Sequence, residues 1–187
     1  LILKVAFEKV SRINVVFTDV DTFTDADFDA YKQTLEVLSL SIVKEYAKGH
    51  CVQFNLLTDR MLLKEMNNCG AADSNITLAP DGKFYVCPAF YYDGVCDGTE
   101  VSLGDVCQKG FSIGSLREGL DIKNSQLYKL DHAPLCRNCD AYQCNRCIWL
   151  NRRTTLEVNT PSHEQCVMAH IERNAARKLL ADIRTLG

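Results

Sequence analysis

Hydrophobic positions in the first third of the chain follow a strand–helix–strand pattern. The run 13–18 (INVVFT) is apolar and β-branched, which is typical of a buried strand. Over 25–48, apolar residues recur every three or four positions, and this spacing predicts an amphipathic helix that ends at Gly49. A second apolar run, 52–57, predicts another strand. This order predicts a parallel pair of strands with open edges, as in the last part of a larger α/β fold.

After about residue 67 the helical periodicity fades and glycines and cysteines become frequent. Two strand-like runs, 75–78 and 83–86, flank the turn sequence Ala79-Pro80-Asp81-Gly82 and predict a β-hairpin. Residues 91–132 predict irregular structure with one short helix near 115–120. We therefore expect two parts, an α/β segment over 1–66 and an irregular, cysteine-rich α+β domain over 67–187.

The end of the chain predicts one more helix. Thr160 has the residue type of an N-cap, and Pro161 suits the first helical position. The expected apolar face consists of Val167, Ile171, Ala175 and Leu179.

Composition and charge exclude several classes of function. The 187 residues are 47% hydrophobic, enough for a core, and the net charge of −3 comes without a basic face. We therefore expect no nucleic-acid partner and no anionic membrane surface as a partner. No apolar run approaches the roughly 20 residues that span a bilayer. The first residue is Leu and no signal peptide follows it, so we expect a piece of a longer, cytoplasmic protein of unknown oligomeric state.

Ten cysteines add candidate chemistry, and four of them form one cluster: Cys136-x2-Cys139-x4-Cys144-x2-Cys147. Cys-x-x-Cys pairs in an intracellular chain indicate metal binding or redox chemistry rather than structural disulfides. Thiolates suit zinc or iron–sulfur centres. A single zinc needs its two pairs on facing turns, and four intervening residues make that difficult. Three of the four can instead bind one centre while the fourth binds another, as in two-cluster ferredoxins.

The missing ligands are available elsewhere in the chain. Cys69 precedes the predicted hairpin, Cys87 ends it, and Cys166 lies in the first turns of the last helix. Seven cysteines then serve two sites. The scattered Cys51, Cys96 and Cys107 are weaker candidates.

This arrangement resembles the SPASM domain, which follows the catalytic barrel of many radical S-adenosylmethionine enzymes. Cys69-x12-Gly82-x4-Cys87, the four-cysteine cluster and Cys166 follow the order of the family pattern. Two spacings within the cluster are each one residue shorter than in the family. The resemblance spans residues 69–166, and it implies two auxiliary [4Fe–4S] clusters. It also implies that the preceding strand–helix–strand segment is the remnant of a partial TIM-like barrel.

The resemblance also assigns the ligands. The proximal cluster would be held by Cys69, Cys87 and Cys147. The distal cluster would be held by Cys136, Cys139, Cys144 and Cys166. The family's further cysteine, a few residues before the position of Cys69, is absent here, since residues 59–68 contain none. The fourth proximal ligand therefore stays open.

The implied activity belongs to a longer parent protein. Its radical chemistry needs Cys-x3-Cys-x2-Cys, which binds the cluster that cleaves S-adenosylmethionine, and this sequence has no such triplet. We therefore expect no catalysis by this chain alone. The parent would mature a ribosomally made peptide. Leu57-Thr58-Asp59-Arg60 and Asn67-Asn68-Cys69-Gly70 are most similar to maturases of peptides with repeated cysteines.

Two alternatives and two groups of polar residues complete the sequence-based picture. A zinc-binding structural or interaction module is the main rival, and zinc can also replace iron in air-exposed protein. An independent electron carrier is disfavoured by the strand–helix–strand segment.

His132, His163 and His170 lie near the cysteines as possible further ligands, although surface or packing roles are more common. Asp19, Asp21 and Asp25 follow the first predicted strand, where capping or a substrate contact are both open.

Overall fold

The computed structural model describes residues 7, 9–17, 19–66, 69–93, 112–121, 126–144 and 146–186. The chain forms two compact units. Unit 1 comprises Leu1–Asn67, Cys139–Asn145 and Ser162–Gly187, and unit 2 comprises Asn68–Asn138 and Arg146–Pro161. The division after Asn67 coincides with the change in sequence character. Residues 139–145 and the C-terminal helix were expected in the 67–187 domain. They belong instead to unit 1, because they pack with the first segment.

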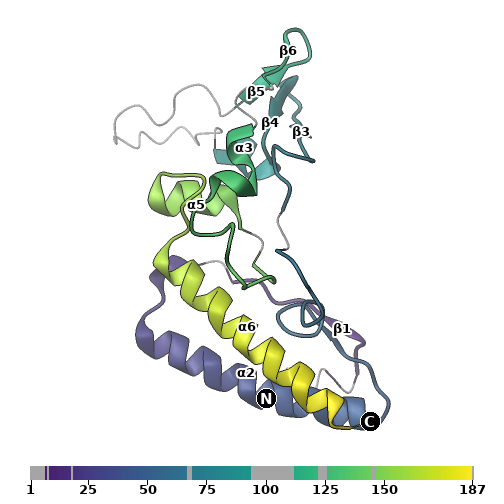
Figure 1. Ribbon diagram of the computed structural model, residues 1–187. Coiled ribbons are helices and arrows are strands. Elements are labelled where there is room, and N and C mark those ends of the chain that lie inside the picture. The colour runs from purple at the N-terminus through teal and green to yellow at the C-terminus, as the bar shows by residue number, and fades with distance from the viewer. Residues whose placement is uncertain are drawn as a thin grey trace. The chain divides into compact units, whose positions relative to one another are not determined.

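Unit 1 contains the predicted strand–helix–strand arrangement (Figure 1). Strand β1 (Arg12–Ile13) pairs in parallel with β2 (Gln53–Phe54), and helix α2 (Asp25–Ala47) lies between them in sequence. The short 3-10 helix η1 (Val20–Thr22) precedes α2. The two-stranded sheet stays open within the described residues, so no closed barrel forms there.

Both strands of unit 1 are shorter than the runs 13–18 and 52–57 that predicted them. The Asn55 side chain donates to the Val15 carbonyl at 2.8 Å and accepts from the Val15 amide at 2.9 Å, so it replaces further ladder bonds. After Phe54 the chain turns at once, because the Phe54 amide donates to Thr58 Oγ1 at 2.6 Å. Hydrophobicity therefore located the strands correctly but overestimated their lengths.

Helix α2 follows the prediction for 25–48 closely. Thr24 and Asp27 form a reciprocal capping box at its start. Of the predicted apolar face, Tyr46 is partly buried against the core, and the other members are buried: Phe28, Tyr31, Leu35, Leu38 and Ile42.

Helix α6 (His163–Arg184) begins two residues later than Thr160 and Pro161 predicted. Ser162 is the N-cap, because its hydroxyl accepts from the Gln165 amide while Gln165 Oε1 accepts from the Ser162 amide. Thr160 instead offers its carbonyl to the Thr155 hydroxyl at 2.7 Å. Helices α2 and α6 lie side by side (Figure 1). Of the expected apolar face, Leu179 is fully buried and Val167, Ile171 and Ala175 pack against the core.

A buried polar pair joins these two helices. The Tyr31 hydroxyl donates to Glu172 Oε1 at 2.8 Å. Burial raises the pKa of Glu172, and the opposing effects of the Tyr31 hydroxyl and the Arg60 charge do not cancel it. Burial, followed by the Glu172 charge, also raises the pKa of Tyr31. The pair therefore favours a protonated carboxyl that holds both helices together.

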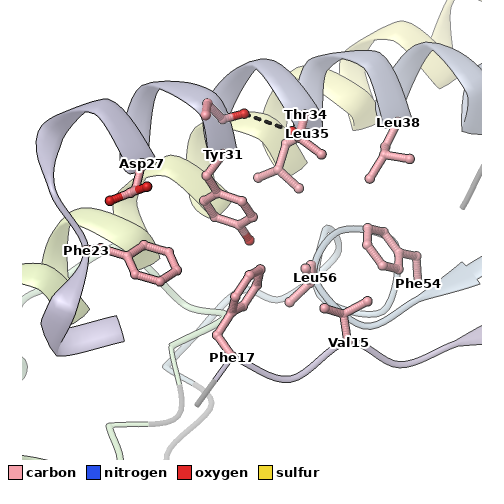
Figure 2. A pocket seen from close by; sticks show the side chains of 11 residues that line it. Val15, Phe17, Phe23, Asp27, Tyr31, Thr34, Leu35, Leu38, Phe54 and Leu56 are labelled. Atoms are coloured by element: carbon pink, nitrogen blue, oxygen red, sulfur yellow. Dashed lines mark hydrogen bonds between the residues drawn. The ribbon is translucent and has the colours of Figure 1, made fainter. Parts of the chain in front are cut away.

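An apolar pocket of about 280 Å³ lies in unit 1 beside α2 (Figure 2). Its lining is mostly aliphatic and aromatic: Val15, Phe17, Phe23, Ala30, Tyr31, Leu35, Leu38, Phe54 and Leu56, with Asp27 and Thr34. The Asp27 carboxylate is already engaged in the capping box, which lowers its pKa. Asp19, Asp21 and Asp25 do not line this pocket, and Asp25 is the first residue of α2.

Unit 2 contains the predicted hairpin within a four-stranded antiparallel sheet. The strands are β3 (Thr77–Leu78), β4 (Lys83–Tyr85), β5 (Ser112–Ser115) and β6 (Gly119–Leu120), paired in that order. The Asp81 carboxylate accepts from the Lys83 amide and from the Tyr85 hydroxyl, and these bonds fix the predicted turn.

The short helix predicted near 115–120 is wrong, because β5 and β6 form a second hairpin there. Gly114 has φ +129°, and a Cβ atom at this position would lie 2.0 Å from the Gly119 carbonyl oxygen. Only glycine permits this approach of the two strands. The apolar spacing around Leu116 does not reveal that the chain needs a glycine at position 114.

Short helices complete unit 2: α3 (Pro88–Asp93), η2 (Gln126–Tyr128), η3 (Leu130–His132) and α5 (Ile148–Thr155). Helix α5 was not predicted. It starts inside the cysteine-rich segment and ends at Leu156, which has a left-handed backbone. The unit has its own core: Ala71, Ala72, Ala79, Tyr85, Val86, Phe90, Ile113 and Ile148.

None of the helices among the described residues combines the length and apolar character that crossing a membrane requires.

Replacing Glu172 by Gln should change how stability depends on pH. The folded state retains a proton on Glu172 at pH values where the unfolded chain has released it, so wild-type stability should fall as pH rises through that window. Glu172→Gln keeps an acceptor for Tyr31 and cannot ionise, so this loss should disappear. Urea unfolding from about pH 5 to about pH 8 measures the effect.

The exposed Glu36 on α2 provides the matched control, since Glu36→Gln should leave the pH profile close to wild type. Equal slopes in the Glu172→Gln and wild-type profiles would contradict the prediction.

Candidate metal centre

None of the described cysteines forms a disulfide; they are Cys51, Cys69, Cys87, Cys136, Cys139, Cys144, Cys147 and Cys166. Cys96 and Cys107 lie outside the described residues. All seven cysteines predicted as ligands can therefore be placed within their units.

Three of the seven gather in unit 2, although 78 positions separate the first from the last. Cys147 interacts electrostatically with Cys69 and with Cys87. Each of the three lies within two positions of a residue of the buried core: Cys69 near Ala71, Cys87 beside Val86, and Cys147 beside Ile148. The apolar core of unit 2 thus places Cys69 and Cys87 near enough to Cys147 to affect its thiol. These three are the residues that the family resemblance assigns to the proximal cluster.

The Cys69 end of this group depends on a tight turn. The Gly70 carbonyl accepts hydrogen bonds from the amides of Asp73, Ser74 and Asn75. Gly70 has φ +65°, and a Cβ atom there would lie 2.3 Å from Ser74 Oγ. A side chain at position 70 would therefore displace the turn that presents Cys69.

Cys147 occupies the N-cap of α5. Partial burial raises the pKa of its thiol, although the residue as a whole is exposed. The backbone N–H groups of Leu150 and Trp149 lower this pKa, whereas Cys69 and Cys87 raise it. The helix terminus thus supplies donors for a thiolate, and the neighbouring sulfurs make a thiolate costly unless a cation shares the charge.

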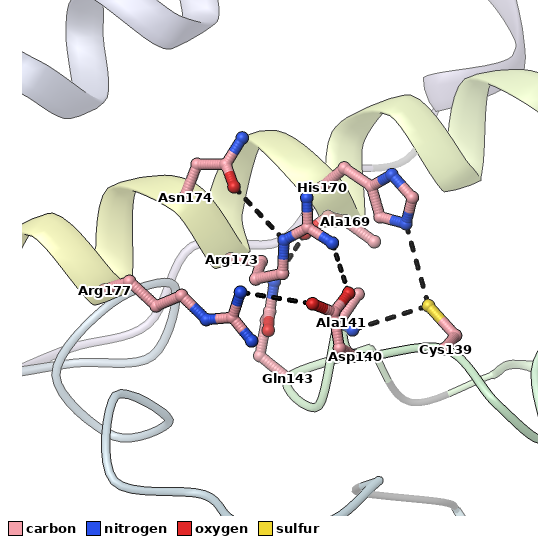
Figure 3. A network of polar contacts seen from close by, with 9 residues as sticks. All are labelled: Cys139, Asp140, Ala141, Gln143, Ala169, His170, Arg173, Asn174 and Arg177. Atoms are coloured by element: carbon pink, nitrogen blue, oxygen red, sulfur yellow. Dashed lines mark hydrogen bonds and ion pairs between the residues drawn. The ribbon is translucent and has the colours of Figure 1, made fainter.

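A second group lies in unit 1, between the loop 139–145 and helix α6 (Figure 3). Cys139 Sγ is 3.6 Å from His170 Nε2 and accepts a hydrogen bond from the Ala141 amide at 3.4 Å. Partial burial raises the pKa of the Cys166 thiol, and Cys139 raises it further. Cys166 and His170 are four residues apart on α6, so both project from one face of the helix.

Polar contacts hold the loop 139–145 on α6 (Figure 3). The buried Gln143 side chain donates to the Ala169 carbonyl, and Arg60 donates to the Gln143 carbonyl at 2.6 Å. Asp140 forms ion pairs with Arg173 and Arg177, and the Arg173 hydrogen bond is the main cause of its lowered pKa. Because these contacts surround Cys139, they fix its sulfur relative to α6.

Two predicted distal ligands remain. Cys144 lies on the same loop as Cys139, and its amide donates to the Ala141 carbonyl at 2.9 Å. Cys136 is buried and belongs to unit 2. The distal set is thus distributed over both units, whereas the proximal set lies in one.

The described residues include no group of three or more His, Cys, Asp or Glu side chains arranged to hold one metal ion. Ligands of one zinc ion lie close together, since sulfur at about 2.3 Å and nitrogen at about 2.0 Å place the two atoms about 3.5 Å apart. The ligand sulfurs of a four-iron cluster bind different irons, so they surround a larger volume.

Sequence reasoning gave His170 no more weight than His132 or His163, and it missed the pairing of Asp140 with two arginines. One signal was available, because the spacing Cys166-x3-His170 places both residues on one helical face. The residue that contacts His170 is set by the tertiary path of the segment around Cys139. Sequence periodicity does not predict that path.

No family model matches the chain, and no curated protein matches it significantly.

Replacing Gln143 by Ala should loosen the loop 139–145. The substitution removes the side-chain hydrogen bond to the Ala169 carbonyl, which keeps its helical partner, at a cost of about 0.5–1.5 kcal/mol. We expect faster alkylation of Cys139 and Cys144 in the metal-free protein and a lower unfolding midpoint. Mass spectrometry of timed labelling gives the first quantity and urea unfolding gives the second.

The exposed Gln33 on α2 is the matched control, and Gln33→Ala should change neither quantity. Unchanged labelling at Cys139 in Gln143→Ala would show that this contact does not hold the loop.

Proposed function

We propose that this chain is the auxiliary-cluster part of a radical S-adenosylmethionine enzyme that matures a ribosomally synthesised peptide in the cytoplasm. The observation that carries the proposal is that Cys69 and Cys87 both act electrostatically on the Cys147 thiol, although the three cysteines come from separate segments of unit 2. The sequence resemblance is the second support, because it assigns the same three residues to one cluster.

The residues fit iron–sulfur clusters in donor type. Thiolates are the usual ligands of such clusters, and none of the seven cysteines forms a disulfide. In this proposal Cys69, Cys87 and Cys147 hold one cluster, and Cys136, Cys139, Cys144 and Cys166 hold the other. When bound, the clusters supply sites that accept and release electrons.

The protein's own groups contribute three things. Backbone N–H groups at the start of α5 stabilise the Cys147 thiolate. The contacts of Asp140 and Gln143 with α6 orient Cys139. The core of unit 2 orders three ligands that lie far apart in sequence. Metal binding should therefore couple to the folding of unit 2.

A zinc module is the second candidate, and one distance favours it. Cys139 Sγ and His170 Nε2 are 3.6 Å apart, close to the spacing of two ligands on one zinc ion. The absence of a third donor around that point among the described residues weighs against it.

Metal and sulfide analysis after anaerobic reconstitution tests the proposal. We expect about four iron and four sulfide per site, and hence about eight of each per chain. Cys147→Ala should lose about half of the chain's iron and sulfide, because the unit 2 site is depleted. Cys166→Ala should lose the other half, because the second site is depleted. Cys51→Ala, at an exposed cysteine outside both sets, should retain full content.

Stoichiometric zinc without sulfide, even when iron and sulfide are supplied, would overturn the proposal in favour of the zinc module. Equal loss of both clusters in Cys147→Ala and Cys166→Ala would contradict the assignment of these residues to separate sites. Far-UV circular dichroism of each variant identifies any that fails to fold.

A further inference from the structure

Cys139 has an environment that differs from that of the other proposed ligands in unit 1. Its sulfur meets two nitrogen donors, the Ala141 amide at 3.4 Å and His170 Nε2 at 3.6 Å (Figure 3). Ala141 belongs to the same loop, but His170 lies 31 positions away on α6. The contact with His170 therefore depends on tertiary structure.

The surrounding contacts hold this geometry in place. Asp140, the next residue after Cys139, is paired with Arg173 and Arg177 on α6. Gln143 is bonded to the carbonyl of Ala169, the residue before His170. The loop and the helix are thus tied together on both sides of the Cys139–His170 contact.

The chemistry of the contact follows from the state of the sulfur. A metal-bound cysteine is a thiolate and has no proton to donate. An attractive contact then requires the hydrogen on Nε2, so that the imidazole donates and the sulfur accepts. The described residues place no third donor with Cys139 and His170 around a common point, which favours hydrogen bonding over a shared metal ion.

We propose that His170 tunes the cluster bound through Cys139, by donating a hydrogen bond from Nε2 to that ligand sulfur. This inference rests on the proposed iron–sulfur function. Reduction adds negative charge to the cluster and its thiolates, and a donor on a ligand sulfur stabilises the reduced state more than the oxidised state. His170 therefore raises the reduction potential of the cluster bound through Cys139.

The unit 2 cluster provides an internal comparison. Cys147 receives its donors from the backbone of Leu150 and Trp149, which side-chain substitution does not remove. The contact of His170 is with Cys139, which is not among the three proposed ligands of the unit 2 cluster. Substitution of His170 should therefore shift one of two potentials.

The test is a redox titration of the reconstituted chain, followed by electron paramagnetic resonance. His170→Leu removes the donor, and one potential should become more negative while the other stays at its wild-type value. His170→Gln retains an N–H donor of similar reach, so its potential should return toward wild type. His50→Gln is the matched control, since the His50 ring contacts Glu45 and should affect neither potential.

Three results would overturn the inference: unchanged potentials in His170→Leu, equal shifts of both clusters, or no recovery in His170→Gln. Strong nitrogen hyperfine coupling in the wild type, lost in His170→Leu together with iron, would make His170 a ligand and would also overturn it. A wild-type chain without iron and sulfide would instead refute the proposed function itself, so the two failures are distinguishable.

Discussion

The packing of α6 against α2 is the interaction on which the rest of unit 1 depends. One side of α6 meets α2 through apolar residues and through the buried Tyr31–Glu172 hydrogen bond. The side that carries Cys166, His170 and Arg173 meets the loop 139–145. The same helix therefore contributes to the hydrophobic core and to the proposed metal site, so a change in its seating would disturb both.

The sequence predicted local structure well where one physical requirement dominates. The periodicity of α2 and the turn at Asp81-Gly82 follow from patterns within a few residues, and the parallel pairing of β1 with β2 follows from the strand–helix–strand order. The sequence failed where a specific contact, and not a repeating pattern, decides the outcome. Gly114 is needed because of Gly119 across a hairpin, and the start of α6 depends on the competition between Thr160 and Ser162 for the N-cap.

The same distinction between sequence patterns and specific contacts applies to the candidate site. Cysteine spacing and family resemblance together assigned Cys69, Cys87 and Cys147 to one set, and these three interact in unit 2. The donors around the sulfurs were not predictable, because they come from a helix terminus at Cys147 and from a side chain 31 positions away at Cys139. Spacing thus selects the candidate ligands, whereas the electrostatic surroundings of each cysteine arise from tertiary contacts.

The discontinuity of unit 1 has a consequence for biosynthesis. The chain leaves this unit after Asn67, returns for residues 139–145, leaves again and returns at Ser162. The Tyr31 hydroxyl therefore cannot form its hydrogen bond until Glu172, 141 positions later, has been synthesised. During translation α2 and the strand pair emerge long before the helix that covers them, with their apolar surface available to chaperones or to other chains. Assembly of unit 1, and of any cluster bound through Cys166, therefore cannot be completed until α6 has been synthesised and has left the ribosome.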